Sequence, residues 1–481
     1  MKYNMKRRSL FVIGALALMM THATINHVGA LTFKPPTGQM WDLWVFYHDG
    51  KYHLFYDHCP VYAIEGVGLA TSEDGVHWKD QGIVIKKPAG AWGIGSGFTW
   101  RSPNFQRDGK FQSNFSVDQK IYFTESTNLF KWEMRQDIVF DKDPQWYKTD
   151  GRWDCIATTP RPEGGYYGYW SASPKDGTYS FGFGQTTDGM HWQALKPPTV
   201  DWGSYAEFKP EHCEVGGVAR IDGKYRAIVN FSRDGSRMLS LVGDRPEGPF
   251  ALTKKNPVLF QADAHFARFF SSPDGPLVVH HNLAKENEKD PKPFDICYMT
   301  PMKRARADKE GTLRLAWWEG NEKLKGEAVG VKTPALQNAL AMLEPRFDVE
   351  SGFVLEGTLS IPAAGAPQPP GIYLESGEKL PTVIRVLHQG ISQIGTVRPD
   401  GSDFQPRPAQ AVWSGTEQID REMPFGPTAR FRLLVRHGML EFYLDDILFH
   451  IRSLSKPATG KIGIVGTAGS VTALKAWQMS L

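Results

Sequence analysis

The chain has 481 residues, of which 41% are hydrophobic, 22% charged and 12% aromatic. This composition excludes a disordered tail, a collagen and a small disulfide scaffold. The formal net charge is only +3. At about 150 residues per domain, the length allows two or three globular domains.

The first 30 residues are predicted to be a signal peptide. Basic residues between Lys2 and Arg8 precede the apolar run Ser9–Met20, and small residues lead up to cleavage near Ala30. Removing its four basic residues from the formal +3 leaves the mature chain near −1. No basic surface then remains for nucleic acid or an anionic membrane, and no later stretch reaches the roughly 18 apolar residues of a spanning helix. We expect a secreted or periplasmic protein without membrane insertion.

Five similar units are predicted over the first 320 residues. Each contains a turn dipeptide between aromatic and β-branched strands, at steps of 59, 56, 58 and 52 residues. The dipeptides are Asp49-Gly50, Asp108-Gly109, Gly164-Gly165, Asp222-Gly223 and Asp274-Gly275. Units of this size are typical of β-propeller blades, which close into a ring. We therefore expect residues 31–325 to form a five-bladed propeller, with an open meander of hairpins as the alternative.

The C-terminal part is predicted to be a second all-β domain. Residues 326–345 are interpreted as a linker, in which Ala335–Leu343 has helix-forming residues. Alternating strand patterns then resume, for example in Phe353–Ile361 and Phe431–Val435. The predicted fold class is all-β: a five-bladed β-propeller followed by a C-terminal β-sandwich over residues 346–481.

Three acidic residues precede the predicted turns at similar distances. Asp42 lies seven residues before Asp49, Asp154 ten before Gly164, and Glu214 eight before Asp222. The innermost strands of propeller blades line one axis, so these acids are expected to converge. Acids in a crowded axis cost several kcal/mol unless they are paired or used. Carboxylates on either side of a neutral substrate are what glycosidic bond cleavage requires.

Residues near these acids are candidates for substrate binding, because tryptophan rings suit sugar faces and polar groups suit sugar hydroxyls. The candidates are Trp41, Trp44, Trp100, Arg101, Arg152, Trp153, Glu211, Asp263 and His265. Glu211 is an alternative to Glu214 as the acidic residue of the fourth blade. Glu214 is favoured because its spacing to the Asp222-Gly223 turn matches that of the acids in the other blades. Asp263 and His265 could instead form a polar pair.

Other reactive residues are predicted to be structural. His280 and His281 are neighbours in a strand, so at most one can face the axis, and both are interpreted as structural. Cys155 and Cys213 are expected to turn away from the axis into the blades.

The four cysteines are too dispersed for a thiolate zinc site, and the sequence leaves disulfides and buried thiols open. We expect no metal, no cofactor and no nucleic-acid partner. Oligomeric state is not indicated.

Several motifs resemble the clan of five-bladed glycoside hydrolases formed by families 32, 43, 62 and 68, most closely family 32, the invertase, inulinase and levanase group. GKYHLFY at Gly50–Tyr56 is similar to the second half of that family's first-blade motif. Ser96-Gly97 is similar to its Ser-Gly-Ser element, Arg152-Trp153-Asp154 to its Arg-Asp-Pro, and Cys213-Glu214 to its Glu-Cys-Pro-Asp. The resemblance implies that Asp42 is the nucleophile, or the base as in family 43. It implies that Asp154 is the transition-state stabiliser and Glu214 the general acid and base.

The chain also departs from the family 32 motifs. Trp41 and Leu43 flank Asp42 where the family has Asn and Pro, and Val215-Gly216-Gly217 is similar to the Glu-Gly-Pro of family 43, which acts on arabinosides and xylosides. The sequence predicts an exported glycoside hydrolase that releases terminal sugars from a neutral oligo- or polysaccharide. The alternatives are an inverting arabinosidase or xylosidase, a non-catalytic carbohydrate-binding propeller and a protein-interaction propeller.

Overall fold

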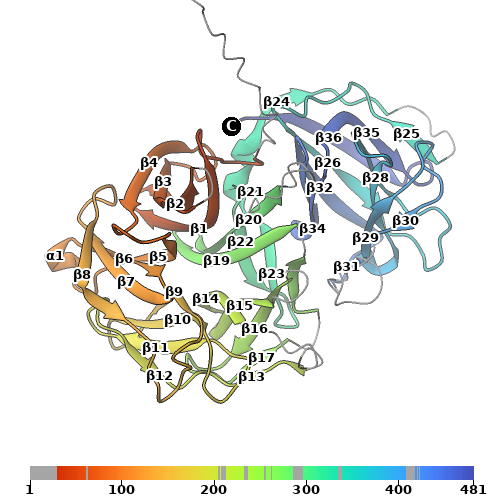
Figure 1. Ribbon diagram of the computed structural model, residues 1–481. Helices are drawn as coiled ribbons and strands as arrows, with labels where there is room; N and C mark the ends of the chain where they lie inside the picture. Colours follow the sequence, from red (N-terminus) through yellow and green to blue (C-terminus); the bar gives the residue numbers. More distant parts are fainter. Residues whose placement is uncertain are drawn as a thin grey trace, which may run out of the picture.

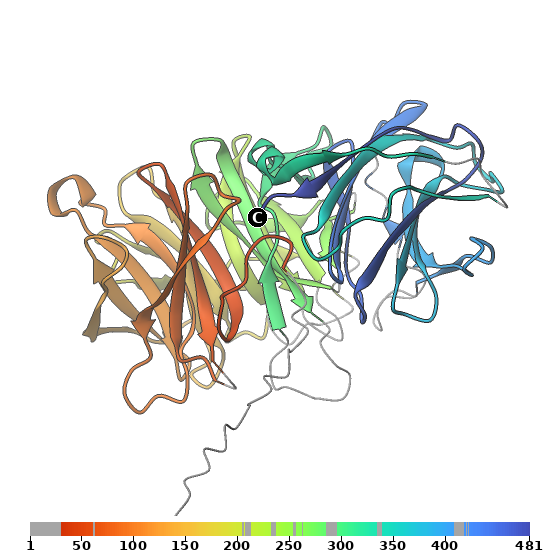
Figure 2. The ribbon, with the colours of Figure 1, turned by 90° about the horizontal axis from the view of Figure 1, so that it is seen from above.

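The computed structural model describes residues 30–60, 63–203, 206, 213–231, 237–253, 256–261, 263–284, 296–333, 339–407, 418–419, 421 and 423–481. The predicted signal peptide therefore lies outside the described residues, apart from Ala30. Antiparallel blades surround a common axis, and a second all-β domain packs beside them (Figures 1 and 2). The predicted fold class is confirmed.

Each blade is an antiparallel sheet whose first strand is innermost. The first blade contains β1 (Gln39–His48), β2 (Lys51–Cys59), β3 (Gly66–Ser72) and β4 (Lys79–Lys86). The second contains β5 (Gly95–Arg101), the short helix α1 (Phe105–Asp108), β6 (Phe111–Val117), β7 (Lys120–Ser126) and β8 (Glu133–Phe140). The third contains β9 (Trp153–Pro160), β10 (Tyr166–Ala172), β11 (Gly182–Thr186) and β12 (Gln193–Leu195).

The fourth and fifth blades complete the ring. The fourth contains β14 (Cys213–Ile221), β15 (Lys224–Phe231), β16 (Arg237–Gly243) and β17 (Phe250–Leu252), flanked by β13 (Val200–Asp201) and β18 (Val258–Gln261). The fifth contains β19 (Ala264–Ser272), β20 (Gly275–Ala284), β22 (Lys303–Ala307) and β23 (Leu313–Trp317). β21 (Ile296–Met299) pairs with both β20 and β1, and so joins the last blade to the first.

The five predicted turn dipeptides all lie where the first strand of a blade connects to the second, and Gly275 of the fifth is the first residue of β20. At the first, Asp49 and Gly50 have φ values of 48° and 76°, and at the fourth, Asp222 and Gly223 have 51° and 77°. Such left-handed pairs are favoured by Asp-Gly and match the twist of a hairpin. The predicted repeat therefore marks the same place in every blade.

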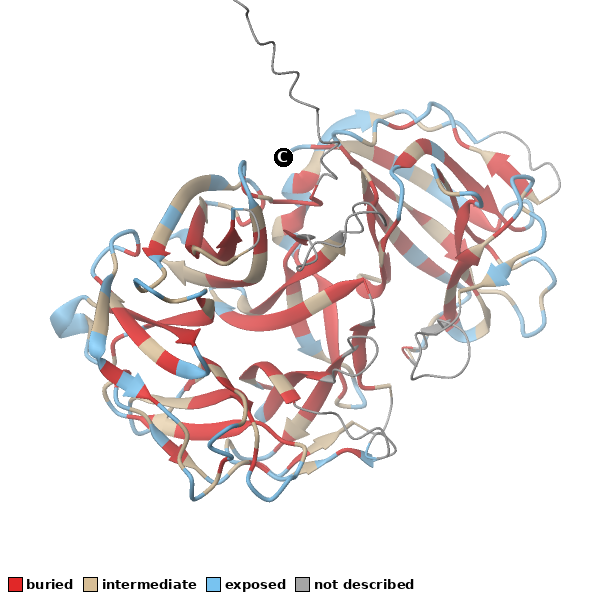
Figure 3. Ribbon diagram, in the orientation of Figure 1, coloured by how far each residue is buried: buried red, intermediate tan, exposed pale blue. Residues whose placement is uncertain are grey.

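The second domain is a sandwich of two sheets. One contains β24 (Lys325–Val329), β36 (Val471–Met479), β26 (Phe353–Ser360), β32 (Thr428–Arg436), β33 (Met439–Leu444) and β34 (Ile447–Ser453). The other contains β25 (Leu340–Met342), β35 (Ala458–Val465), β27 (Gly371–Ser376), β28 (Thr382–Val386), β29 (Ser392–Thr396), β30 (Gln405–Pro406) and β31 (Gln418–Ile419). Buried hydrophobic residues from both sheets form its core, and buried residues are coloured red along these strands in Figure 3.

The predicted linker over 326–345 is wrong where the structure describes it. After a 3-10 helix (Glu319–Leu324), β24 and β25 contribute one edge strand to each sandwich sheet. Within the helix-prone segment Ala335–Leu343, residues Leu340–Met342 form a strand that pairs with β35. Sheet pairing here outweighs local helix propensity, which is a weak preference. Residues 334–338 lie outside the described part.

Buried charges join the propeller to the sandwich. Lys303 on β22 and Glu441 on β33 are fully buried, and their Nζ and Oε1 atoms are 2.6 Å apart. The Tyr443 hydroxyl donates to Glu441 at 2.6 Å, and His280 lies 3.7 Å from the same carboxylate. His280 thus belongs to the domain interface, as expected for a structural residue. Among the described residues, no helix is long and apolar enough to cross a membrane.

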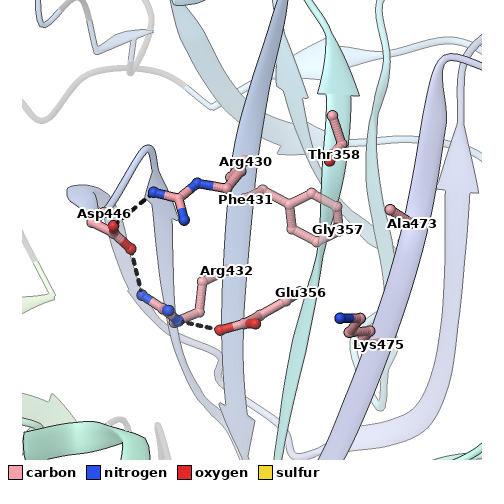
Figure 4. A pocket seen from close by; sticks show the side chains of 9 residues that line it. All are labelled: Glu356, Gly357, Thr358, Arg430, Phe431, Arg432, Asp446, Ala473 and Lys475. Carbon is pink, nitrogen blue, oxygen red and sulfur yellow. Dashed lines mark hydrogen bonds and ion pairs between the residues drawn. The ribbon is translucent and has the colours of Figure 1, made fainter. Parts of the chain in front are cut away.

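Arg432 on β32 makes the densest set of polar contacts in the pocket on the sandwich face shown in Figure 4. Its guanidinium lies 2.6 Å from Glu356, 2.8 Å from Asp446 and 3.1 Å from Glu322, and 4.0 Å from the ring centroid of Trp317 in the propeller. The cation is therefore shared between the two domains.

We expect Arg432→Ala to lower the free energy of unfolding by about 2–3 kcal/mol, because it removes a cation–π contact and charge-assisted hydrogen bonds to three carboxylates, each of which keeps a second cation in Lys325 or Arg430. Arg430→Ala is the matched control: Arg430 lies two residues away, its side chain is 71% exposed, and its ion pair among the described residues is with Asp446. Its loss should cost less than about 0.5 kcal/mol. Equal losses in urea unfolding would contradict this view of the interface.

Candidate active site

The inner strands of all five blades begin at the same end of the axis. Near these beginnings lie Asp42 on β1, Ser96 on β5, Asp154 on β9, Glu214 on β14 and His265 on β19. Ion pairs and hydrogen bonds link these side chains, as described below, so residues more than 200 positions apart in the sequence form one cluster. The three predicted acids are therefore brought together.

Every inner strand has an irregular register close to its site residue. The shifts fall at Trp41/Leu43 in β1, between Gly95 and Phe98 in β5, opposite Tyr169/Ser171 in β9, at Val215/Gly217 in β14 and between His265 and Arg268 in β19. A β-bulge adds a residue to one strand and redirects the side chains next to it. The bulges let polar side chains turn toward the axis without reversing the rest of each strand.

Asp42 is the extra residue of the first bulge. Its φ of 30° is unusual for a residue other than glycine. Burial raises the pKa of its carboxyl, whereas the positive charge of Arg268, the neighbouring His265 and a hydrogen bond with Ser96 lower it. The Arg268 guanidinium lies 4.0 Å from the Asp42 carboxylate. A nucleophile or base must be ionised, and these three neighbours favour the ionised form.

Arg152 holds the other two acids. Its Nε donates to Asp154 at 2.8 Å, and its Nη1 lies 2.5 Å from Oε1 of Glu214. The Asn230 amide also donates to Glu214, at 2.7 Å, and the His265 ring lies 3.8 Å from the same carboxylate. These contacts fix the orientation of both acids. Their side chains keep 24% and 13% exposure, so both remain partly accessible to solvent.

Arg268 lies beneath the acids and is 2% exposed. It donates to the carbonyl of Gly97 and lies 3.9 Å from the Cys155 thiol. The guanidinium packs over the rings of Phe266 and Trp44 at 4.5 and 5.7 Å. Cys155 therefore faces the axial cluster and not only the blade, which corrects the expectation for it. Cys213 lies in a blade core, and none of the four buried cysteines forms a disulfide.

Three tryptophans predicted to contact the substrate belong instead to blade cores. Trp44, Trp100 and Trp153 are 1%, 3% and 0% exposed. Their ring nitrogens donate to Thr99, Gln112 and the carbonyl of Phe140, respectively. Trp153 is next to Asp154, and neighbours in a regular strand face opposite sides, so its ring is turned away from that acid.

Three other predicted contacts also lie elsewhere. Arg101 ends β5, about 16 Å along the strand from Ser96 at about 3.3 Å per residue, and contacts His48. Asp263 is 2% exposed and binds Arg407 of the sandwich, 3.1 Å away, so it is a domain-interface residue. Glu211 lies outside the described residues.

Trp41, Arg152 and His265 are placed at the axis, as expected. The Trp41 ring lies 5.9 Å from His265 and 5.3 Å from His281. His281, interpreted as structural, therefore also reaches the axial cluster. It is completely buried, and burial holds its pKa well below the usual value, so the ring is neutral.

Asp57 is a further acid that the sequence analysis missed. It directly follows the KYHLFY motif on β2, and pairs with Trp41 on β1. It is 1% exposed. Its position two residues from Phe55 would have marked it as facing the same side as a buried residue, which is unusual for an acid.

One group of side chains has the ligand types of a metal site. Asp42, His265 and His281 each offer one ligand atom, and these atoms lie within 4.8 Å of one another. The Arg268 cation, 4.0 Å from the Asp42 carboxylate, already supplies positive charge at this place. We therefore assign no metal to this group.

The comparisons with known proteins agree with this geometry. Residues 33–104 match the model of the glycosyl hydrolases family 32 N-terminal domain. No curated protein matches the sequence.

Solved structures match almost the whole chain. A fructofuranosidase from Schwanniomyces occidentalis complexed with fructose is 13% identical, with a TM-score of 0.66, over 94% of this chain and 98% of that one. Fructan 1-exohydrolase IIa from Cichorium intybus is 15% identical, with a TM-score of 0.66 and coverages of 94% and 97%. Exo-inulinase from Aspergillus awamori is 12% identical, with a TM-score of 0.64 and coverages of 93% and 97%.

At these identities the structural likeness establishes the fold. The predicted resemblance to the five-bladed clan, closest to family 32, is confirmed. Together, these matches show that residues 33–104 are similar to the family 32 N-terminal domain and that almost the whole chain has the propeller-and-sandwich fold of family 32 glycoside hydrolases.

Proposed function

We propose that the protein is an exported glycoside hydrolase that releases terminal sugars from a neutral oligo- or polysaccharide. Asp42 is the nucleophile or base, Asp154 stabilises the positive charge of the transition state, and Glu214 is the general acid. The observation that carries the proposal is the convergence of these three acids, from three blades, at one open end of the axis.

The surroundings of the acids support these roles. Burial raises the pKa of Asp42, and Arg268, His265 and Ser96 oppose that shift by favouring the ionised form, which attack on an anomeric carbon or on a water proton requires. Asp154 and Glu214 are held together by Arg152, on a different pair of blades from Asp42. A sugar at the axis would then have carboxylates from different directions, as glycoside cleavage needs.

Fructosides are the first substrates to test, because fructose is bound in the S. occidentalis structure. Trp41 and Leu43 replace the Asn and Pro that flank the acid in family 32, so arabinosides and xylosides are the second class.

A panel of fructans, arabinans, xylans and algal glycans tests the proposal. The mature protein should release a monosaccharide from at least one of them, detected by anion-exchange chromatography. NMR of the first product anomer then assigns retention or inversion. Binding of a glycan without sugar release would favour the non-catalytic propeller instead.

A further inference from the structure

Asp57 is a buried acid for which the proposed reaction gives no role. Among the described residues, neither of its carboxylate oxygens has a hydrogen-bond partner, and the side chain is 1% exposed. A buried ionised carboxylate without a partner costs far more than a neutral one. The retention of such a group beside the site calls for a physical explanation.

The charges around Asp57 indicate which form it takes. Asp42 on β1 and Asp154 on β9 are the acids that act on it, Arg268 on β19 is the cation, and the Cys59 thiol is near it on its own strand. Arg152 already forms ion pairs with Asp154 and Glu214. Arg268 is therefore the cation that acts on both Asp42 and Asp57. Of these two, Asp42 is nearer to solvent, with 20% side-chain exposure.

Hydrogen-bonding capacity points the same way. One oxygen of Asp42, Oδ1, is buried and has no donor within the described part of the chain. A protonated Asp57 would add an O–H donor, which still needs an acceptor. Two ionised carboxylates would leave all of these oxygens unsatisfied, whereas one proton on Asp57 supplies the missing donor.

We propose that Asp57 is a neutral carboxylic acid in the working protein and shares its proton with Oδ1 of Asp42, directly or across one water molecule. Asp57 is thus a positioning residue that orients Asp42 and stabilises the ionised form of Asp42. Because Asp57 carries no charge, the positive charge of Arg268 then acts on Asp42 alone. Burial and the charge of Asp42 both raise the pKa of Asp57 well above its usual value, in agreement with this role. The kinetic part rests on the proposed function; the protonation of Asp57 does not.

The first arm of the test measures stability and needs no activity. A carboxyl whose pKa is raised on folding keeps a proton that the unfolded chain loses above about pH 4. The parent protein should therefore lose stability as the pH rises from about 5 to about 8, relative to Asp57→Asn, which has nothing to titrate. The urea midpoint of Asp57→Asn should exceed that of the parent by a growing margin. A margin that is constant with pH would overturn the neutral state.

Asp263→Asn is the matched control for this arm. Asp263 is equally buried, at 2% exposure, but is paired with Arg407 at 3.1 Å. Its replacement should lower the midpoint at neutral pH, opposite in sign to Asp57→Asn. A lowered midpoint for Asp57→Asn as well would show that Asp57 is ionised and paired, and would overturn the proposal.

The second arm measures the pH profile of kcat/KM on the substrate found by the glycan panel. Asp57→Asn keeps an N–H donor, so its acidic limb should coincide with that of the parent. Asp57→Leu has no donor, so Asp42 should ionise at higher pH, and the acidic limb should move up by about one unit. An unmoved limb in a folded Asp57→Leu protein would overturn the shared proton. If the parent itself releases no sugar, the proposed function fails, and the urea arm still decides the state of Asp57.

Discussion

Asp42→Asn is expected to lower kcat/KM by about 10³-fold or more on the substrate that the parent protein cleaves. Asparagine has nearly the same shape as aspartate, and tolerates the positive φ of 30° at this bulge. Its amide, however, can neither attack an anomeric carbon nor accept a proton from water. The loss should therefore appear in kcat with little change in stability, whichever of the two roles Asp42 has.

Asp49→Asn is the matched control for this substitution. Asp49 follows Asp42 by seven residues in the same blade, is exposed, and also has a positive φ, of 48°. Asparagine is a favoured residue in such a turn, so activity and stability should stay within about twofold of the parent. If Asp42→Asn retained the activity of the Asp49→Asn protein, Asp42 would not take part in the reaction. The set of three acids would then have to be abandoned as catalytic.

The sequence was sufficient to predict the blades and their acids because both depend on local patterns. Asp-Gly turns recur at a nearly constant step, and Asp42, Asp154 and Glu214 lie at similar distances before them. A ring of blades converts this equivalence into proximity. The prediction thus needed the repeat and the topology, but no knowledge of side-chain contacts.

The environment of the acids could not be predicted in the same way. Trp153 is next to Asp154 in the sequence, yet it points into the blade core and is 0% exposed. Adjacency in a strand places side chains on opposite faces, so it argues against shared contact. His281 and Asp57 reach the cluster from second strands, where no turn spacing marks them. Bulges in the inner strands changed the facing of single residues, and the sequence contains no clear signal for them.

The interface between the domains was also beyond sequence reasoning. Asp263 precedes the fifth inner strand, which is where an axial acid would be expected. Its carboxylate instead binds Arg407 of the sandwich, 144 positions away. A pairing of this kind depends on how two domains pack, which no local pattern encodes. The same holds for the Lys303–Glu441 pair.

Glu214→Gln is expected to lower kcat/KM by about 10²–10⁴-fold on a natural glycan, the effect of losing a general acid. Glutamine retains one oxygen that can accept from Arg152, while its NH2 group replaces the oxygen that accepts from Asn230. The Arg152–Asp154 pair should therefore survive. It cannot donate the proton that a sugar leaving group needs. The loss should therefore depend on the leaving group, which separates an acid from a residue that only binds.

The decisive comparison is between a glycan and an aryl glycoside of the same sugar with a good leaving group, such as dinitrophenol. A leaving group of low pKa departs without protonation, so cleavage of the aryl glycoside by Glu214→Gln should fall by less than about tenfold. Arg152, only 2.5 Å from Glu214, favours the ionised carboxylate in the free site. If Glu214→Gln lost activity equally on both substrates, Glu214 would act as an anion beside Arg152 that holds the sugar or the base in place. The proton for the leaving group would then have to come from another group at the axis.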